Sequence, residues 1–417
     1  MPQIEKPAIS NERSLFDDKV QQVVSFLMEH YDIRIPIQDP AKIQISCKDK
    51  HRYTFPPTFN DISLHLMSES IIVGDNMLRK IIRSPNQIAP VNPVINYFNR
   101  IRGQWKGVSH IDILSSHIIP RVFDGNSDTY YRERTDRLIR KWLVACVACW
   151  TKGIANDVAL GFVDVRGGSG KTYFTQFILP DELSEFYVQA SKDEHKFDIE
   201  DAYTRYMIVN FEELNGLSKG SINTFKMAQT CTHITTKMRH EEFPSKKNRL
   251  ACSMFNTNFN EENGGFIQSW YGPDTRRFGC IEIADIQQEY STIVDVDQMW
   301  SEALTLCESS SFNYHFDKAD YEEFNAYNAR YKFETDAMRY IQSYTEIPEN
   351  DNEGEKLNPT QILQRLIKDR RIKSEDMNKI TPQKIGLALN ALGYQAVTYR
   401  SKTDNNEPRK GYHLKFI

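Results

Sequence analysis

Residues 167–172 carry the clearest chemistry in the chain, because their types match a loop that binds phosphate. The loop follows the apolar run V-A-L-G-F-V and consists of Gly167, Gly168, Ser169, Gly170, Lys171 and Thr172. Glycines let backbone N–H groups converge on an anion, the lysine neutralises phosphate charge, and the threonine hydroxyl joins a Mg²⁺ shell. The pattern predicts a catalytic site for ATP and Mg²⁺, with a glycine-rich turn carrying an incidental lysine as the alternative. One position departs from the pattern, since Val165 stands where a first glycine is usual.

A pair of carboxylates is the second feature of this predicted site. The apolar run Y-M-I-V-N-F ends in Glu212 and Glu213. We predict that Glu212 holds Mg²⁺ through water and that Glu213 polarises the attacking water as general base. Aspartate is usual at the first position, so Glu212 is a second departure. The alternative is a solvated turn at the end of a strand.

Two further polar groups complete the predicted chemistry. The strand R-L-A-C-S-M-F ends in N-T-N, and Asn258, with Asn256 as the alternative, is predicted to orient the attacking water. Arg276 and Arg277 stand just before another apolar run, C-I-E-I. A guanidinium there would stabilise transition-state charge on the nucleotide of a neighbouring subunit. The alternative is an arginine pair on the surface.

The composition limits the class of protein. The chain has 417 residues, of which 40% are hydrophobic and 26% charged, and its net charge is −4. We expect a globular cytoplasmic protein without a membrane span or signal peptide. Cys146 and Cys149 form a C-x-x-C, but they recur with apolar residues at helical spacing, which favours a buried helix over a zinc site. His110 and Asp112 are expected on the surface.

The order of apolar and polar segments predicts three domains and a linker. Residues 1–150 carry mostly helical signals, whereas residues 151–347 contain short apolar runs that alternate with mixed segments, as in a parallel α/β sheet. The acidic stretch 348–355 is expected to be a linker. Residues 356–417 read as helix, turn, helix and two strands, which predicts a winged helix, and they carry thirteen Lys/Arg against five Asp/Glu.

The order of these motifs resembles the virulence-associated protein E family of replicative helicases from phages and mobile elements, which is related to superfamily 3 helicases of the AAA+ class. The matching pieces are R-K-W-L-V-A-C-V-A (140–148), G-G-S-G-K-T (167–172), N-F-E-E-L (210–214), N-T-N (256–258) and T-R-R-F (275–278). The resemblance covers roughly residues 90–290. The C-terminal block is similar to the small domain of Bacteroides-type members. The resemblance implies an AAA+ P-loop NTPase core that assembles into a homo-oligomeric ring, usually a hexamer.

The resemblance also implies that single-stranded DNA passes through the ring, where a β-hairpin points into the pore. Lys246 and Lys247, near a Pro-Ser turn, and Lys237 and Arg239, on the incoming strand, are the expected phosphate contacts. The alternative is a solvated charged hairpin.

In the C-terminal block, Thr381 is expected to cap the second helix, with Gly393 at its end. Lys384 on this helix, and Arg409 and Lys410 on the wing, are predicted to contact duplex DNA. The alternative is a domain for protein contacts.

The function predicted from these features is ATP-dependent DNA unwinding in the replication of a phage or mobile element. An ATP-dependent initiator or loader that remodels DNA without processive movement is the second hypothesis. A nucleotide-switched regulator or defence protein is the third.

Overall fold

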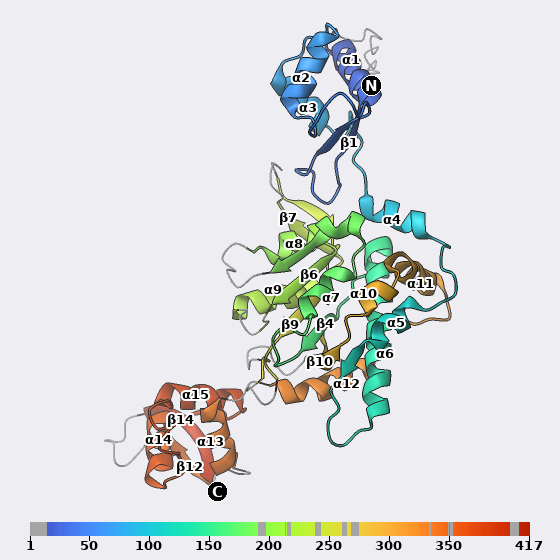
Figure 1. Cartoon of the computed structure of the whole chain (residues 1–417). Coiled ribbons are helices and arrows are strands. Elements are labelled where there is room, and N and C mark those ends of the chain that lie inside the picture. The colour runs from blue at the N-terminus through green and yellow to red at the C-terminus, as the bar shows by residue number, and fades with distance from the viewer. Residues whose placement is uncertain are drawn as a thin grey trace, which may run out of the picture.

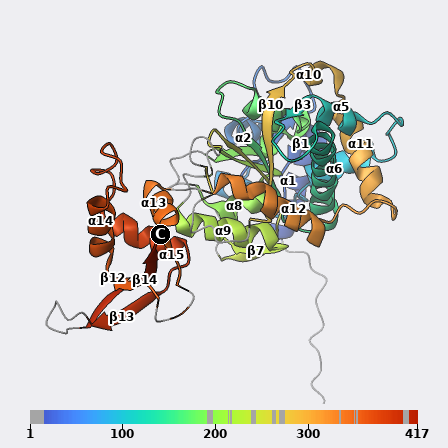
Figure 2. The same cartoon turned by 90° about the horizontal axis from the view of Figure 1, so that it is seen from below.

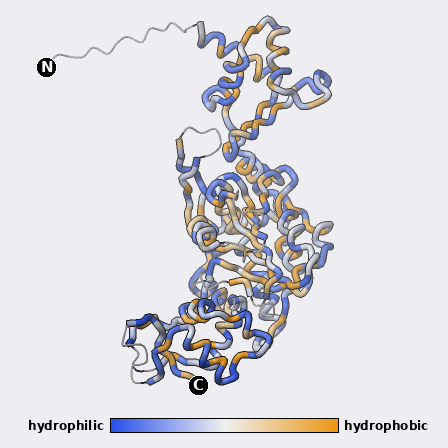
Figure 3. Tube along the Cα trace, turned by 90° about the vertical axis from the view of Figure 1, so that its left-hand side faces the viewer, coloured by the Kyte–Doolittle hydropathy of each residue, from blue (hydrophilic) through white to orange (hydrophobic). Residues whose placement is uncertain are grey.

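Three bodies follow one another along the chain in the computed structural model (Figure 1). The structure describes residues 15–190, 197–212, 214, 218–237, 243–260, 265–267, 275–332, 335–348, 350, 353–400 and 408–417. The N-terminal unit and the C-terminal unit lie on either side of a central body that contains the largest sheet (Figure 1). Apolar residues occur throughout all three bodies (Figure 3), and each body has its own cluster of buried side chains.

The N-terminal unit is a small mixed fold, in which a pair of short strands accompanies the helices that the sequence predicted. Its elements are α1 (Leu15–His30), β1 (Tyr31–Arg34), β2 (Gln44–Cys47), α2 (Phe59–Ser68) and α3 (Asp75–Arg83). β1 and β2 pair antiparallel from Tyr31 opposite Cys47 to Arg34 opposite Gln44. Strands of four residues give little periodic signal, which explains why the sequence pattern did not reveal them. An ion pair between Asp39 and Arg205 joins this unit to the central body.

The central body contains a six-stranded sheet with the order β3-β10-β4-β9-β6-β5. Five of its strands are parallel and β3, at one edge, is antiparallel to β10. This confirms the expected parallel sheet. The sheet strands are β3 (Ile118–Pro120), β4 (Ala159–Val163), β5 (Tyr187–Ala190), β6 (Ile208–Glu212), β9 (Cys252–Thr257) and β10 (Phe278–Ile286).

Helices surround the sheet, and a separate hairpin of β7 (His233–Thr236) and β8 (Ser245–Asn248) extends from it. The helices are α4 (Pro93–Ile101), α5 (His110–Ser116), α6 (Asp128–Lys152), α7 (Lys171–Phe177), α8 (Ile199–Arg205), α9 (Lys219–Thr230), α10 (Tyr290–Ile293), α11 (Val296–Glu308) and α12 (Lys318–Asn328), with the 3₁₀ helices η1 (Asp181–Phe186) and η5 (Ala329–Tyr331).

Alternate residues of each strand enter two different cores. In β4, Leu160 and Phe162 pack with residues of α6, α7 and α11, whereas Val163 packs with residues of α8 and α9 on the other face. This is the period of two that a strand buried on both faces requires. Gly161 of β4 allows the Phe255 ring of β9 to lie against the strand, because a Cβ atom at this position would overlap the ring.

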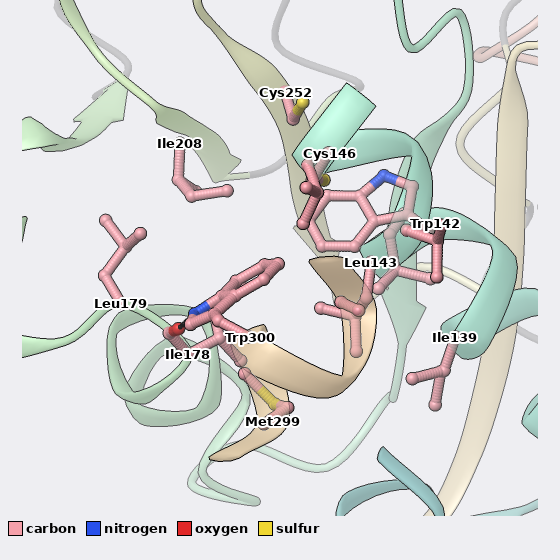
Figure 4. Close-up of a cluster of buried hydrophobic side chains, with 14 of the residues drawn as sticks. Ile139, Trp142, Leu143, Cys146, Ile178, Leu179, Ile208, Cys252, Met299 and Trp300 are labelled. Atoms are coloured by element: carbon pink, nitrogen blue, oxygen red, sulfur yellow. Dashed lines mark hydrogen bonds between the residues drawn. The ribbon is translucent and has the colours of Figure 1, made fainter. Parts of the chain in front are cut away.

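The C-terminal part of helix α6 is buried on all sides, because every residue from Trp142 to Trp150 is buried. Trp142, Leu143 and Cys146 of α6 lie with Met299 and Trp300 of α11 in the core shown in Figure 4. Cys146 and Cys149 are both buried, so the expectation of a core helix is confirmed. Within the described residues, no cluster of His, Cys, Asp or Glu is arranged to hold a metal ion. The domain boundary expected after residue 150 falls inside α6.

The C-terminal unit begins before the expected linker. Its elements are α13 (Asp336–Tyr344), β11 (Thr345–Glu346), β12 (Glu355–Leu357), α14 (Pro359–Lys368), α15 (Pro382–Ala391), β13 (Ala396–Arg400) and β14 (Pro408–Phe416). Ala337 and Ile341 of α13 are buried in the same core as α14 and α15, and β11 and β12 both pair with β14. Residues 348–355 therefore connect two strands of one sheet. Figure 2 shows this unit standing apart from the central body.

The expected order of helix, turn, helix and two strands is present in the C-terminal unit, together with its caps. The Thr381 hydroxyl accepts a hydrogen bond from Lys384 N, and Gly393, just after the C-cap of α15, has a φ of 86°. Across the described part of the chain, no helix is both long and apolar enough to cross a membrane.

Candidate functional site

The loop between β4 and α7 turns sharply at two glycines. Gly168 and Gly170 have φ values of 81° and 84°, a region that other residues rarely adopt. Val165 is the residue that replaces the usual first glycine, and it is 40% exposed. Its φ is not among the positive values found at non-glycine residues of the described chain, which are those of Ser70 and Arg370. The turn therefore does not need a glycine at position 165.

The Lys171 side chain is buried at the start of α7, where it is surrounded by oxygen atoms. Its Nζ atom donates to Asn258 Oδ1 at 3.1 Å, to the Asp164 carbonyl oxygen at 3.2 Å and to Ser169 Oγ at 3.4 Å. Burial lowers the pKa of the Lys171 ammonium, and the nearby Asp164 carboxylate opposes this shift. The side chain is thus held at the mouth of the loop by three acceptors.

Asp164 also lies at this site, although the sequence pattern did not single it out. It directly follows β4, and its carboxylate Oδ2 lies 3.9 Å from Lys171 Nζ. Burial would raise the pKa of its carboxyl, but hydrogen bonds from Ser169 and Arg166 and the charge of Lys171 lower it overall. An acidic residue at the end of an apolar run was the available signal, although it is a weak one.

Thr172, in the first turn of α7, and Glu212, the last residue of β6, lie next to each other. The Thr172 hydroxyl donates to Glu212 Oε1 at 3.1 Å, across the gap between the loop and the end of β6. A hydroxyl and a carboxylate are both hard oxygen ligands of the kind that Mg²⁺ takes. The structure therefore places the two predicted metal-site residues next to each other. Glu213, the predicted general base, lies outside the described residues.

The end of β9 lies between the ends of β4 and β6. Thr257 pairs with Val163 of β4, and Asn256 pairs with Glu212 of β6. Asn258, two residues after Asn256, accepts a hydrogen bond from Lys171 Nζ. Asn256 is buried, and its side-chain amide has no hydrogen-bond partner within the described residues. Both candidate asparagines therefore lie at this site, and Asn258 contacts the loop.

These residues line a cavity of about 390 Å³. The lining consists of Gly167, Gly168, Ser169, Gly170, Lys171, Thr172, Tyr173, Glu212, Asn256, Thr257 and Asn258. A volume of this size is typical of small-ligand sites, and the carboxyl edge of a parallel sheet is their usual place. The arrangement offers backbone N–H groups, one ammonium and two hard oxygen ligands to a phosphorylated ligand.

Arg276 and Arg277 lie at the amino ends of the parallel strands, whereas the cavity lies at their carboxyl ends. They precede Phe278, which pairs with Ala159, the first residue of β4. The loop follows Val163, at the other end of the same strand. Four residues of a strand span about 13 Å, so the arginine pair is remote from the cavity of its own chain. The Arg276 guanidinium lies 5.5 Å from the centre of the Tyr321 ring.

The β7–β8 hairpin is present. Lys246 and Lys247 lie within β8, opposite Thr235 and Ile234 of β7, directly after Pro244 and Ser245. Successive strand residues point to opposite faces, so the two lysines cannot act together. Lys246 is exposed, and so is Lys237 just after β7, whereas Lys247 is half-buried. Arg239 lies outside the described residues.

The basic residues proposed for the C-terminal unit are all exposed. Lys384 lies in the first turn of α15, and its Nζ atom donates to the Lys379 carbonyl oxygen at 2.6 Å. Arg409 and Lys410 lie near the start of β14, opposite Tyr399 and Thr398. The helix and the strand thus each present basic side chains to solvent.

Comparison with known proteins gives one family match and several distant structural likenesses. Residues 100–333, more than half of the 417 residues, match the model of the virulence-associated protein E-like domain. No curated protein matches the chain. A solved apo structure of the NrS-1 C-terminal region (305–718) is 12% identical, covers 95% of this chain and 99% of that chain, and has a TM-score of 0.44. An A-form apo structure of the same region is also 12% identical, covers 96% and 100%, and has a TM-score of 0.43.

Proposed function

Because this chain belongs to the virulence-associated protein E-like family, we propose that it is an ATP-dependent DNA helicase that acts in the replication of a phage or mobile element. One observation supports this proposal above the others. The glycine-rich loop, Lys171, the Thr172–Glu212 pair and Asn258 converge on a single cavity from three adjacent strands.

The residues predicted from the sequence have defined tasks in the proposed reaction. The loop N–H groups and Lys171 bind the phosphates of ATP, and Thr172 and Glu212 hold Mg²⁺, directly and through water. Bound Mg²⁺ would neutralise charge that develops on the phosphates. Asn258 orients the attacking water, and Glu213, next to Glu212 in the chain, takes its proton.

The order of the strands also supports an ATPase core of the AAA+ class. Numbered along the chain, the parallel strands β4, β5, β6, β9 and β10 stand in the order 5-1-4-3-2. The strand that carries Asn258 therefore lies between the strand of the phosphate loop and the strand of the acidic pair. This is the arrangement that a water-orienting residue needs, because the γ-phosphate must lie between the loop and the general base.

We further propose a ring of identical subunits with DNA in its pore. Arg276 and Arg277 are remote from the cavity of their own chain, so their proposed role requires the nucleotide of a neighbouring subunit. Lys237 and Lys246 on the exposed face of the hairpin would contact single-stranded DNA. In the C-terminal unit, a winged helix, Lys384, Arg409 and Lys410 would contact the phosphates of duplex DNA.

A strand-displacement assay separates this proposal from the second hypothesis, an initiator or loader. The full chain is mixed with forked DNA, Mg²⁺ and ATP, and the Lys171→Ala variant serves as control. A helicase releases the labelled strand continuously, and only with ATP and Lys171. Release that stops at a few base pairs would favour a loader, and an ATPase indifferent to DNA would favour the nucleotide-switched regulator.

A further inference from the structure

The phosphate loop is attached to the end of β10 by two side chains. Gln288 lies two residues after β10, and its Nε2 atom donates to the Ser169 carbonyl oxygen at 3.4 Å and to the Ile286 carbonyl oxygen at 3.1 Å. Arg166, inside the loop, donates through its guanidinium to the Ala284 carbonyl oxygen of β10. One hydrogen bond therefore runs from the segment after β10 to the loop, and another runs from the loop to β10.

Gln288 also packs against the loop at Gly170. A Cβ atom on Gly170 would overlap the Gln288 side-chain amide, so this amide packs directly on the turn at Gly170. Among the described residues that line the cavity, Gln288 does not occur. It contacts Ser169 and Gly170, which do line the cavity, and so it can influence a bound phosphate through the shape of the loop.

Arg166 extends the attachment toward Lys171. Its backbone N and its Nε atom donate to Asp164 Oδ1 at 2.8 and 3.2 Å. The carbonyl oxygen of Asp164 in turn accepts from Lys171 Nζ at 3.2 Å. A continuous set of hydrogen bonds thus runs from β10 through Arg166 and Asp164 to the ammonium group at the cavity.

We infer that Gln288 and Arg166 are positioning residues that hold the phosphate loop, before nucleotide binds, in the shape that binds nucleotide, an inference that rests on the function proposed above. β10 is a rigid support because it pairs with β4 over five residues and with β3 on its other side. A loop rich in glycine otherwise loses more conformational freedom when it orders around a ligand. Holding it beforehand improves nucleotide affinity without changing the chemical step.

The test compares Gln288→Leu with Gln287→Leu in the full chain. Gln287 is the preceding residue and, like Gln288, it is exposed; its backbone N–H donates to the His117 carbonyl oxygen, a bond that the substitution leaves intact. A fluorescent ATP analogue reports Kd, and steady-state hydrolysis separates KM from kcat. Gln288→Leu is expected to raise Kd and KM about 3- to 10-fold, the effect of one hydrogen bond, with kcat within about 2-fold. Gln287→Leu should match the wild type.

A second readout needs no nucleotide at all. Amide hydrogen exchange of residues 165–170 in the nucleotide-free protein should become faster in Gln288→Leu and remain unchanged in Gln287→Leu. Combining Gln288→Leu with Arg166→Met should give less than the sum of the two effects, since both attach one loop. Unchanged exchange and unchanged Kd in Gln288→Leu would overturn the inference. Failure of the wild type to bind ATP would instead count against the proposed function.

Discussion

Glu212 stands where aspartate is usual in the acidic pair, and its contact with Thr172 allows this difference to be tested. Its carboxylate already touches the Thr172 hydroxyl, at 3.1 Å. Aspartate is shorter by one carbon–carbon bond, about 1.5 Å, so Glu212→Asp leaves room for a water between carboxylate and metal. We expect Glu212→Asp to keep or improve ATP hydrolysis.

Glu212→Ala should instead require far more Mg²⁺ and lose about 10²-fold or more in kcat, as removal of a group that stabilises the transition state does. Titrating Mg²⁺ against the hydrolysis rate of the two variants measures this. The same Mg²⁺ dependence in Glu212→Ala as in the wild type would remove Glu212 from the metal site.

At the residue scale, the sequence predicted the loop but not what holds it. Lys171, Thr172 and Asn258 follow from residue types and spacing, because each stands next to an apolar run that ends at the same edge of the sheet. Asp164 has only the weak signal of an acidic residue after an apolar run, and Gln288 has none. Gln288 contacts Ser169, which lies 119 residues earlier in the chain, and only the fold brings these two segments together.

Among the elements, the β7–β8 hairpin places the adjacent residues Lys246 and Lys247 on opposite faces. Lys246 shares an exposed face with Lys237, whereas Lys247 shares the face of the buried Ile234. We expect Lys246→Ala to reduce strand displacement and to lower the salt slope of single-strand binding by about 0.7. Lys247→Ala is the matched control, with basal ATP hydrolysis intact in both. Equal loss in both variants would mean that the hairpin acts through its fold and not through this face.

The C-terminal unit also has a different boundary from the one that the acidic stretch 348–355 indicated. The polar run has the composition of a linker, but it lies between β11 and β12, strands of two and three residues. Such strands are too short to leave a periodic signal. The helix caps at Asn358 and Thr381 are local, so the sequence could reveal them.

We therefore expect a chain that ends at Lys332 to be the stable truncation. It keeps Tyr331, whose hydroxyl donates to the buried Glu282, and removes the whole C-terminal unit. Duplex binding should fall sharply while ATP hydrolysis and single-strand binding persist. A chain that ends at Pro348 should melt at a lower temperature than the chain that ends at Lys332. It keeps α13 but lacks α14 and α15, whose side chains bury Ile341. Unchanged duplex affinity in the Lys332 truncation would show that the unit serves protein contacts.

In the whole molecule, the cavity and the arginine pair lie at opposite ends of the parallel strands. The loop follows the carboxyl ends of the strands, and Arg276 and Arg277 precede β10 at the amino ends. A transition-state arginine contributes about 10³–10⁵ in rate in related reactions. An Arg276→Ala, Arg277→Ala variant mixed with Lys171→Ala should recover part of the lost hydrolysis through mixed interfaces. Full activity of a strictly monomeric chain would contradict this prediction.

The sequence could predict the parallel sheet but not the order of its strands. The apolar runs indicate strands, whereas their order in the sheet depends on long-range pairing of β9 between β4 and β6. The small mixed fold of the N-terminal unit was missed for the same reason, since β1 and β2 are defined by their pairing with each other.

We propose that the cavity between β4, β9 and β6 hydrolyses ATP at a rate that DNA controls. The decisive measurement is steady-state ATP hydrolysis by the wild type and by Lys171→Ala, each with and without single-stranded DNA. We expect Mg²⁺-dependent hydrolysis that DNA accelerates in the wild type, and a loss on the order of 10²-fold or more in Lys171→Ala. Hydrolysis at the same rate by both folded proteins, or none by the wild type with DNA present, would contradict it.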